Sequence, residues 1–186
     1  MDSSTAIANL VKRLRPIRWD WGPGCLERVV AELGLVDPTT GNERDVSFRT
    51  SNPDLPPGAG EHPYSFNRSG PGVELFRVDL ESIDMGEVHL YEPERYQEVF
   101  EEGHARCRAG FRKASRRIAK LLGPPVCEGE RDESNVYEAY PYGWGTDAAA
   151  VWQLENARLM LLYGYEDKEL PISLELLVCR PREDYD

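Results

Sequence analysis

The chain has 186 residues, of which 40% are hydrophobic and 30% are charged, with a formal net charge of −11 and a pI of about 4.8. This composition is that of a globular protein and excludes a disordered or membrane-spanning chain, and the length predicts a single domain over residues 1–186. The acidic excess argues against nucleic acid or an anionic membrane as the main partner and favours a basic protein, because an acidic surface repels phosphate.

Two short helices are expected near the N-terminus, over residues 4–15 and about 26–33. Each has four apolar residues spaced i, i+3, i+4 and i+7, which is the spacing of one helix face. These positions are Ile7, Leu10, Val11 and Leu14 in the first helix, and Leu26, Val29, Val30 and Leu33 in the second. Pro16 ends the first helix and Gly34 ends the second.

A strand is expected at 46–50, and residues 51–72 form the least regular part of the chain, an irregular loop rich in proline and glycine. A hairpin follows, with strands at 73–80 and 87–91 that turn through residues 84–86.

The longest helix is expected over residues 93–122, where an apolar stripe of period 3.6 is interrupted only at Gly103 and His104. We expect Cys107, Phe111 and Ile118 on this stripe to be buried against a sheet. Acidic residues come first in this helix and basic residues later, which complements the helix dipole. We interpret the seven cations between residues 106 and 120 as a solvated helix face rather than a nucleic-acid site.

An acidic linker at 128–133 leads into a predicted C-terminal meander of four antiparallel strands, at 136–142, 148–154, 158–165 and 172–178. Each strand has apolar or aromatic residues at alternate positions, which places them on one face, and the short connections favour antiparallel neighbours. The predicted fold class is therefore α+β, an antiparallel sheet with one long helix and two short N-terminal helices.

The sequence contains no motif that carries catalysis or binds a metal. The three histidines lie in different predicted elements, and the four cysteines form no CxxC pair, so neither a metal nor a cofactor is expected. Nucleophile and phosphate-binding motifs are likewise absent from the sequence. With no apolar run typical of a signal peptide or a membrane span, we expect a cytoplasmic protein with reduced thiols.

One end of the meander gathers aromatic and acidic residues, from which a second interpretation follows. These residues are Glu138, Tyr140, Tyr142, Trp144 and Asp147, with Trp152, Tyr163 and Tyr165 on adjacent strands. They suit a ligand cleft, a protein-binding face or ordinary aromatic packing of a sheet, since strands favour aromatic residues.

Three segments resemble the C-terminal hairpins of small bacterial immunity proteins of polymorphic toxin systems. They are 151–154 (Val-Trp-Gln-Leu), 158–161 (Arg-Leu-Met-Leu) and 166–171 (Glu-Asp-Lys-Glu-Leu-Pro). The resemblance covers residues 151–171 and transfers no functional residue. It implies a small, acidic, cytosolic α+β protein that acts by binding and not by catalysis.

The leading hypothesis is a non-enzymatic immunity-type inhibitor that neutralises a basic toxin through an acidic surface. The residues expected to contact the partner are Glu130, Asp132, Glu133, Tyr142, Trp144, Glu166, Asp167 and Glu169. One alternative is an enzyme or small-ligand-binding protein that uses the aromatic end of the meander. Another is an accessory subunit of a bacterial secretion or phage-like system.

Overall fold

The computed structural model describes residues 3–40, 44–69, 72–130, 146–165, 167 and 170–181. The helices in these ranges are α1 (Ser3–Leu14), α2 (Cys25–Leu33), α3 (Met85–Tyr91) and α4 (Tyr96–Leu122), with a 3₁₀ turn η1 (Pro93–Arg95) directly before α4. The strands are β1 (Leu35–Thr40), β2 (Asp45–Thr50), β3 (Tyr64–Ser69), β4 (Gly72–Ile83), β5 (Cys127–Glu130), β6 (Thr146–Gln153), β7 (Arg158–Gly164) and β8 (Ile172–Cys179).

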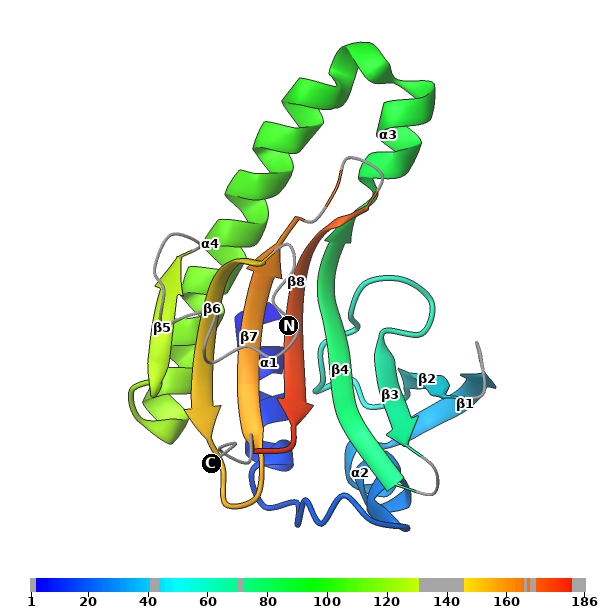
Figure 1. Cartoon of the computed structure of the whole chain (residues 1–186), viewed down its shortest axis with the longest axis vertical. Helices are drawn as coiled ribbons and strands as arrows, with labels where there is room; N and C mark the ends of the chain where they lie inside the picture. The colour runs from blue at the N-terminus through cyan, green and yellow to red at the C-terminus, as the bar shows by residue number, and fades with distance from the viewer. Residues whose placement is uncertain are drawn as a thin grey trace.

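Within the described ranges, the strands form one antiparallel sheet in the order β1-β2-β3-β4-β8-β7-β6-β5 (Figure 1). Its central strand pair joins β4 to β8, so the N-terminal and C-terminal parts of the chain meet in the middle of the sheet. Helices α1 and α4 pack against each other behind the sheet in the view of Figure 1. The α+β fold predicted from the sequence is confirmed.

The main core lies between the helices and one face of the sheet. All four predicted apolar residues of α1 are buried, and α4 buries Cys107, Phe111 and Ile118 as expected. The strands contribute Trp152 and the alternating residues of β7 and β8 to the same cluster. Gly103, where the apolar stripe of α4 is interrupted, lies close to the sheet, and a methyl group there would stand 2.8 Å from Ile172 and 2.9 Å from Ile83. The interruption is therefore a point of close approach.

The opposite face of the sheet has a smaller apolar cluster of its own. Its buried members are Ala149, Val151, Met160, Leu162, Leu177 and Cys179. Strands β6, β7 and β8 consequently bury apolar side chains on both faces, which is why their sequences are nearly continuous apolar runs.

The connections beside the helices are held by buried polar contacts. The indole of Trp21 donates to the Asn156 carbonyl at 2.8 Å and joins the segment after α1 to the turn between β6 and β7. The Tyr64 hydroxyl donates to the Pro56 carbonyl, and Leu55 is buried, so the loop at 51–63 is attached to the core.

Three local predictions are wrong. Residues 87–91 are helical, because the Asp84 side chain accepts a hydrogen bond from the Glu87 amide at 3.0 Å and starts α3, while β4 continues to Ile83. The irregular segment 51–72 contains β3, which pairs with β2 and β4. The acidic linker begins with β5, whose short sequence pairs with β6.

The predicted meander is present in its last three strands, β6, β7 and β8, which pair in sequence order. Its first predicted strand, 136–142, lies outside the described residues. The long helix has its expected end at Leu122, and its first residues, 93–95, form η1.

Candidate functional site

A helical hairpin made of α3, η1 and the first turns of α4 projects beyond the end of the sheet (Figure 1). We call residues 84–102 the acidic hairpin. It contains seven acidic residues and one arginine, so its net charge is −6 out of −11 for the whole chain. More than half of the chain's net negative charge therefore lies on one projecting element.

The tip of the acidic hairpin exposes two large apolar side chains. Leu90 is 71% exposed and Tyr91 is 78% exposed, the largest fraction among the large apolar residues in the described part of the chain. Arg95 forms exposed ion pairs with Glu92 and, at 3.8 Å, with Glu98. The surface is thus an apolar tip bordered by carboxylates.

Aromatic side chains join the hairpin to the end of the sheet. We call Tyr96, Phe100, His104, Tyr163 and Tyr165 the aromatic cluster. The Phe100 ring lies 4.3 Å from His104 and 5.1 Å from Tyr165, measured between ring centroids. The hydroxyls of Tyr96 and Tyr165 are 2.5 Å apart and share a hydrogen bond. The hairpin is therefore attached to Tyr165, the residue that follows β7, by ring contacts and a polar bond, and not only by the helix backbone.

His104 is the polar centre of this cluster. Its Nδ1 is hydrogen-bonded to the Tyr163 hydroxyl and lies 3.9 Å from an Asp147 carboxylate oxygen. Burial lowers the pKa of His104, although the Asp147 charge opposes the shift. Burial, with a contribution from Asp147, raises the pKa of Tyr163 to about 12. A neutral imidazole and a protonated phenol are thus the forms present at neutral pH.

The other ring nitrogen of His104, Nε2, is buried and has no hydrogen-bond partner in the described structure. A buried donor without a partner costs about 1–3 kcal/mol. This is the one feature of the cluster that suits a ligand with a hydrogen-bond acceptor.

A pair of carboxylates lies on the face of the sheet opposite the helices. Asp79 on β4 and Glu175 on β8 are directly opposite in register, and Arg77 pairs with Glu175 at 3.4 Å. Burial, followed by the Glu175 charge, raises the pKa of Asp79 to about 6. No group of three or more potential metal-ligating side chains occurs in the described ranges.

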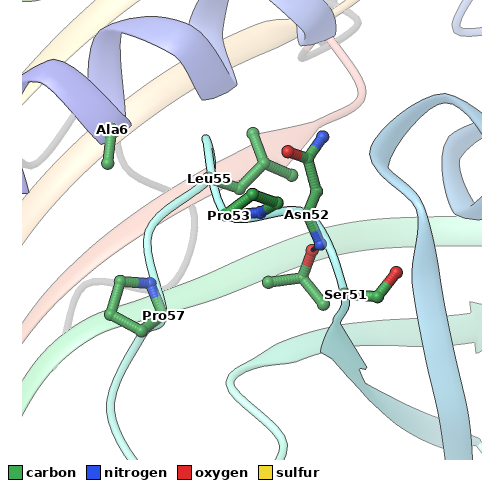
Figure 2. A pocket seen from close by; sticks show the side chains of 7 residues that line it. Ala6, Ser51, Asn52, Pro53, Leu55 and Pro57 are labelled. Carbon is green, nitrogen blue, oxygen red and sulfur yellow. Dashed lines mark hydrogen bonds between the residues drawn. The ribbon is translucent and has the colours of Figure 1, made fainter. Parts of the chain in front are cut away.

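A cavity of about 410 Å³ lies between the loop after β2 and α1 (Figure 2). It is lined by Ala6, Thr50, Ser51, Asn52, Pro53, Leu55 and Pro57. None of these side chains titrates, and the Asn52 carbonyl oxygen and the Thr50 hydroxyl are already used in local turns. The cavity therefore offers shape but no acid or base that could activate the hydroxyls of Thr50 and Ser51.

The residues predicted to contact a partner are only partly described. Glu130 is exposed on the edge strand β5 and pairs with Arg112 at 3.3 Å, and Asp167 is exposed beyond β7. The other six, Asp132, Glu133, Tyr142, Trp144, Glu166 and Glu169, lie outside the described residues. Within the predicted aromatic end, Asp147, Tyr163 and Tyr165 do come together.

The sequence pattern does not identify the acidic hairpin as a surface, although its charges are visible in the sequence. The glutamates also fit the helix dipole, and Leu90 and Tyr91 fit the predicted strand at 87–91. The available signal was a pair of large apolar residues flanked by acids, just before a helix whose first turns are also acidic.

Comparison of the chain with protein-family models, curated proteins and solved structures finds no match. In the described part of the chain, no helix is long and apolar enough to cross a membrane.

Proposed function

We propose that this protein acts by binding another protein that presents a basic surface, and that the acidic hairpin is the contact surface. The observation that carries the proposal is a net charge of −6 on one projecting element whose tip exposes Leu90 and Tyr91. An apolar centre with a charged border is the usual anatomy of a protein interface, and tyrosine is a frequent anchor residue.

The specific form that we propose is an immunity-type inhibitor without catalytic activity of its own. Proteins that act on nucleic acids bind phosphate through lysine and arginine. An acidic hairpin has the charge to occupy such a surface in place of the substrate. The acidity of the chain and the resemblance of residues 151–171 to immunity proteins support this form.

The attachment of the hairpin favours binding by a preformed surface. The aromatic cluster and the bond between Tyr96 and Tyr165 fix the first turns of α4 against β7. A surface that is ordered before binding loses less conformational entropy on association. We therefore expect little change in the hairpin between the unbound and bound protein.

The proposal is tested by binding kinetics against the product of the neighbouring gene at several salt concentrations. The double variant Glu87→Lys/Glu92→Lys should lower the association rate at least tenfold at low salt, since long-range attraction determines that rate. Tyr91→Ala should instead raise the dissociation rate.

The matched control is the double variant Glu27→Lys/Glu155→Lys, which changes the net charge equally. Both of these residues are exposed, and they lie on α2 and in the turn between β6 and β7, at the end of the molecule away from the hairpin. If the control and the hairpin variant lower the association rate equally, the hairpin is not the contact surface.

A second candidate function is the binding of a small ligand at the aromatic cluster, favoured by the buried Nε2 of His104. A ligand of this kind would accept a hydrogen bond from the imidazole. Thermal-shift screening of small carboxylates and alcohols tests it, with His104→Phe as the variant that should abolish any shift. Ligand binding that is equal in the two proteins would exclude this site.

A further inference from the structure

The outer face of α4 has a regular pattern that starts in the acidic hairpin, which contains Glu98 and Glu102, and continues into a part of the helix that the proposed function does not use. Six exposed residues are spaced four, three, four, three and four positions apart: Glu98, Glu102, Ala105, Ala109, Arg112 and Arg116. They lie on the side of the helix opposite the buried Gly103, Cys107, Phe111 and Ile118. Alternate spacings of three and four residues produce a straight seam along a helix. We call these six residues the α4 seam.

The charges of the α4 seam are self-complementary. Two glutamates precede two alanines, and two arginines follow them, so the seam is acidic at one end, small in the middle and basic at the other. Consider a second α4 that lies antiparallel to the first and is related to it by a two-fold axis at the level of residue 107. Glu98 then faces Arg116 of the second copy, and Glu102 faces its Arg112. Ala105 then faces Ala109 of the second copy, where the small side chains let the helices approach closely.

We infer that the α4 seam is the interface of an antiparallel homodimer. Every seam residue finds a complementary residue under the same two-fold operation, which is the property of a contact between identical subunits. A parallel arrangement would instead place glutamate against glutamate and arginine against arginine. The occupant of this helix face is therefore a second copy of the chain.

Intramolecular contacts are compatible with this arrangement. Arg106, which lies beside the seam near the axis, pairs with Glu81 of its own chain and does not add an uncompensated charge. Arg112 pairs with Glu130 at 3.3 Å, but both side chains are about 60% exposed. Exposed pairs contribute little to stability, so exchanging Glu130 for Glu102 of the second copy is inexpensive.

The size of the seam indicates a weak dimer. From Glu98 to Arg116 the helix rises roughly 27 Å, and a contact one helix wide and this long lies at the low end of specific interfaces. We expect a dimer that depends on protein concentration and on salt. Leu90 and Tyr91 precede α4 and lie outside the seam, so both tips remain available in the dimer. The inference goes beyond the proposed function and does not rest on it.

The experiment measures the mass of the full chain by sedimentation equilibrium across protein and salt concentrations. We expect dimers at low salt and at least tenfold weaker association at 500 mM than at 50 mM salt, because charges at an exposed interface are screened. Two variants, Glu98→Lys/Glu102→Lys and Arg112→Glu/Arg116→Glu, should each be monomeric. Mixing them should restore a 1:1 dimer, because each variant repels itself and complements the other.

Cross-linking tests the register. A mixture of Ala105→Cys and Ala109→Cys chains should form a disulfide-linked dimer under mild oxidation, whereas either variant alone should form much less. Unfolding midpoints that match the natural chain would show that all four variants are folded. A natural chain that stays monomeric at low salt, or a variant mixture that fails to associate, overturns the inference and assigns this helix face to another protein or to solvent. Glu87→Lys/Glu92→Lys should leave the dimer unchanged, which separates this result from the test of partner binding.

Discussion

The two parts of α4 follow the same apolar stripe but occupy different environments. From Gly103 to Leu122 the stripe packs into the main core, where Cys107, Phe111 and Ile118 are almost completely buried. From Tyr96 to Glu102 the helix extends past the main body of the sheet, and its stripe residues, Tyr96 and Phe100, are only half-buried. The stripe residues are thus buried where the helix meets the sheet and partly exposed where it leaves the sheet. One helix therefore provides stability at one end and a surface at the other.

The largest loss of stability should follow a substitution in the part of α4 that packs into the main core. Phe111→Ala should lower the free energy of unfolding by about 3–5 kcal/mol, because it leaves a cavity at a buried site. Denaturant titration followed by circular dichroism measures the change. An unchanged midpoint would show that this part of α4 does not carry the core.

Phe100→Ala makes the same chemical change in the projecting part. Because Phe100 is only partly buried, the loss should be smaller, roughly 1.5–2.5 kcal/mol. The same titration, performed on both variants, measures the ratio. Equal losses of unfolding free energy would mean that the two parts of the helix are packed equally well.

The pH dependence of stability tests the junction between the two parts. Because the pKa of His104 is lowered in the folded protein, the unfolded chain binds more protons below about pH 6.5, so this residue's contribution to stability is lost on acidification. His104→Gln should flatten that decline. The effect should be smaller than that of Phe100→Ala.

This measurement needs the natural chain as its reference. Asp79, whose pKa is raised to about 6, acts in the opposite sense, since the folded protein then binds the additional proton as the pH falls. The natural chain and the His104→Gln variant both retain Asp79, so the difference between their curves of stability against pH reports the contribution of His104. A difference that does not vary between pH 5 and 7 would contradict the assignment.

The smallest effect should come from the hairpin tip. Leu90→Ser and Tyr91→Ser should each change the free energy of unfolding by less than about 0.5 kcal/mol, because both side chains are exposed. Thermal unfolding measures it. A loss of 2 kcal/mol or more would place these side chains in a structural contact and weaken their proposed role as an anchor.

Periodic apolar patterns were sufficient to predict most of the fold. Helices α1, α2 and α4 and strands β2, β6, β7 and β8 coincide with segments of period 3.6 or 2. The burial of Cys107, Phe111 and Ile118 followed from the same pattern. Elements of this kind are specified by local sequence, since the spacing of their apolar residues determines which face can be buried.

The missed elements lack such a pattern. In β1, five of the six residues are exposed, and in β5 the four residues Cys127–Glu130 include two glutamates and a glycine. These strands form because neighbouring strands offer backbone partners, which the residues of β1 and β5 do not reveal by themselves. Likewise, α3 depends on the cap at Asp84, and its apolar residues alone fitted a strand equally well.

The candidate site was only partly predictable for a related reason. The gathering of Asp147, Tyr163 and Tyr165 followed from strand alternation, but the approach of His104 depends on how α4 packs against β7. Whether a charged helix face is solvated or available to a partner also depends on where the helix lies. Sequence order places Glu98 and Arg116 far apart, and only a second copy of the helix would bring such residues together.

The irregular strand β1 has a consequence for behaviour in concentrated solution. The sheet is open, and its outermost strand interrupts its own ladder between Val36 and Thr39, where Asp37 has a φ of 52° and Pro38 lacks an amide proton. At the other margin, β5 is short and carries exposed glutamates. Among the described residues, neither margin presents a long, flat row of unpaired backbone groups that a strand from another molecule can extend. We therefore expect these two strands to limit edge-to-edge association of the sheet at high protein concentration.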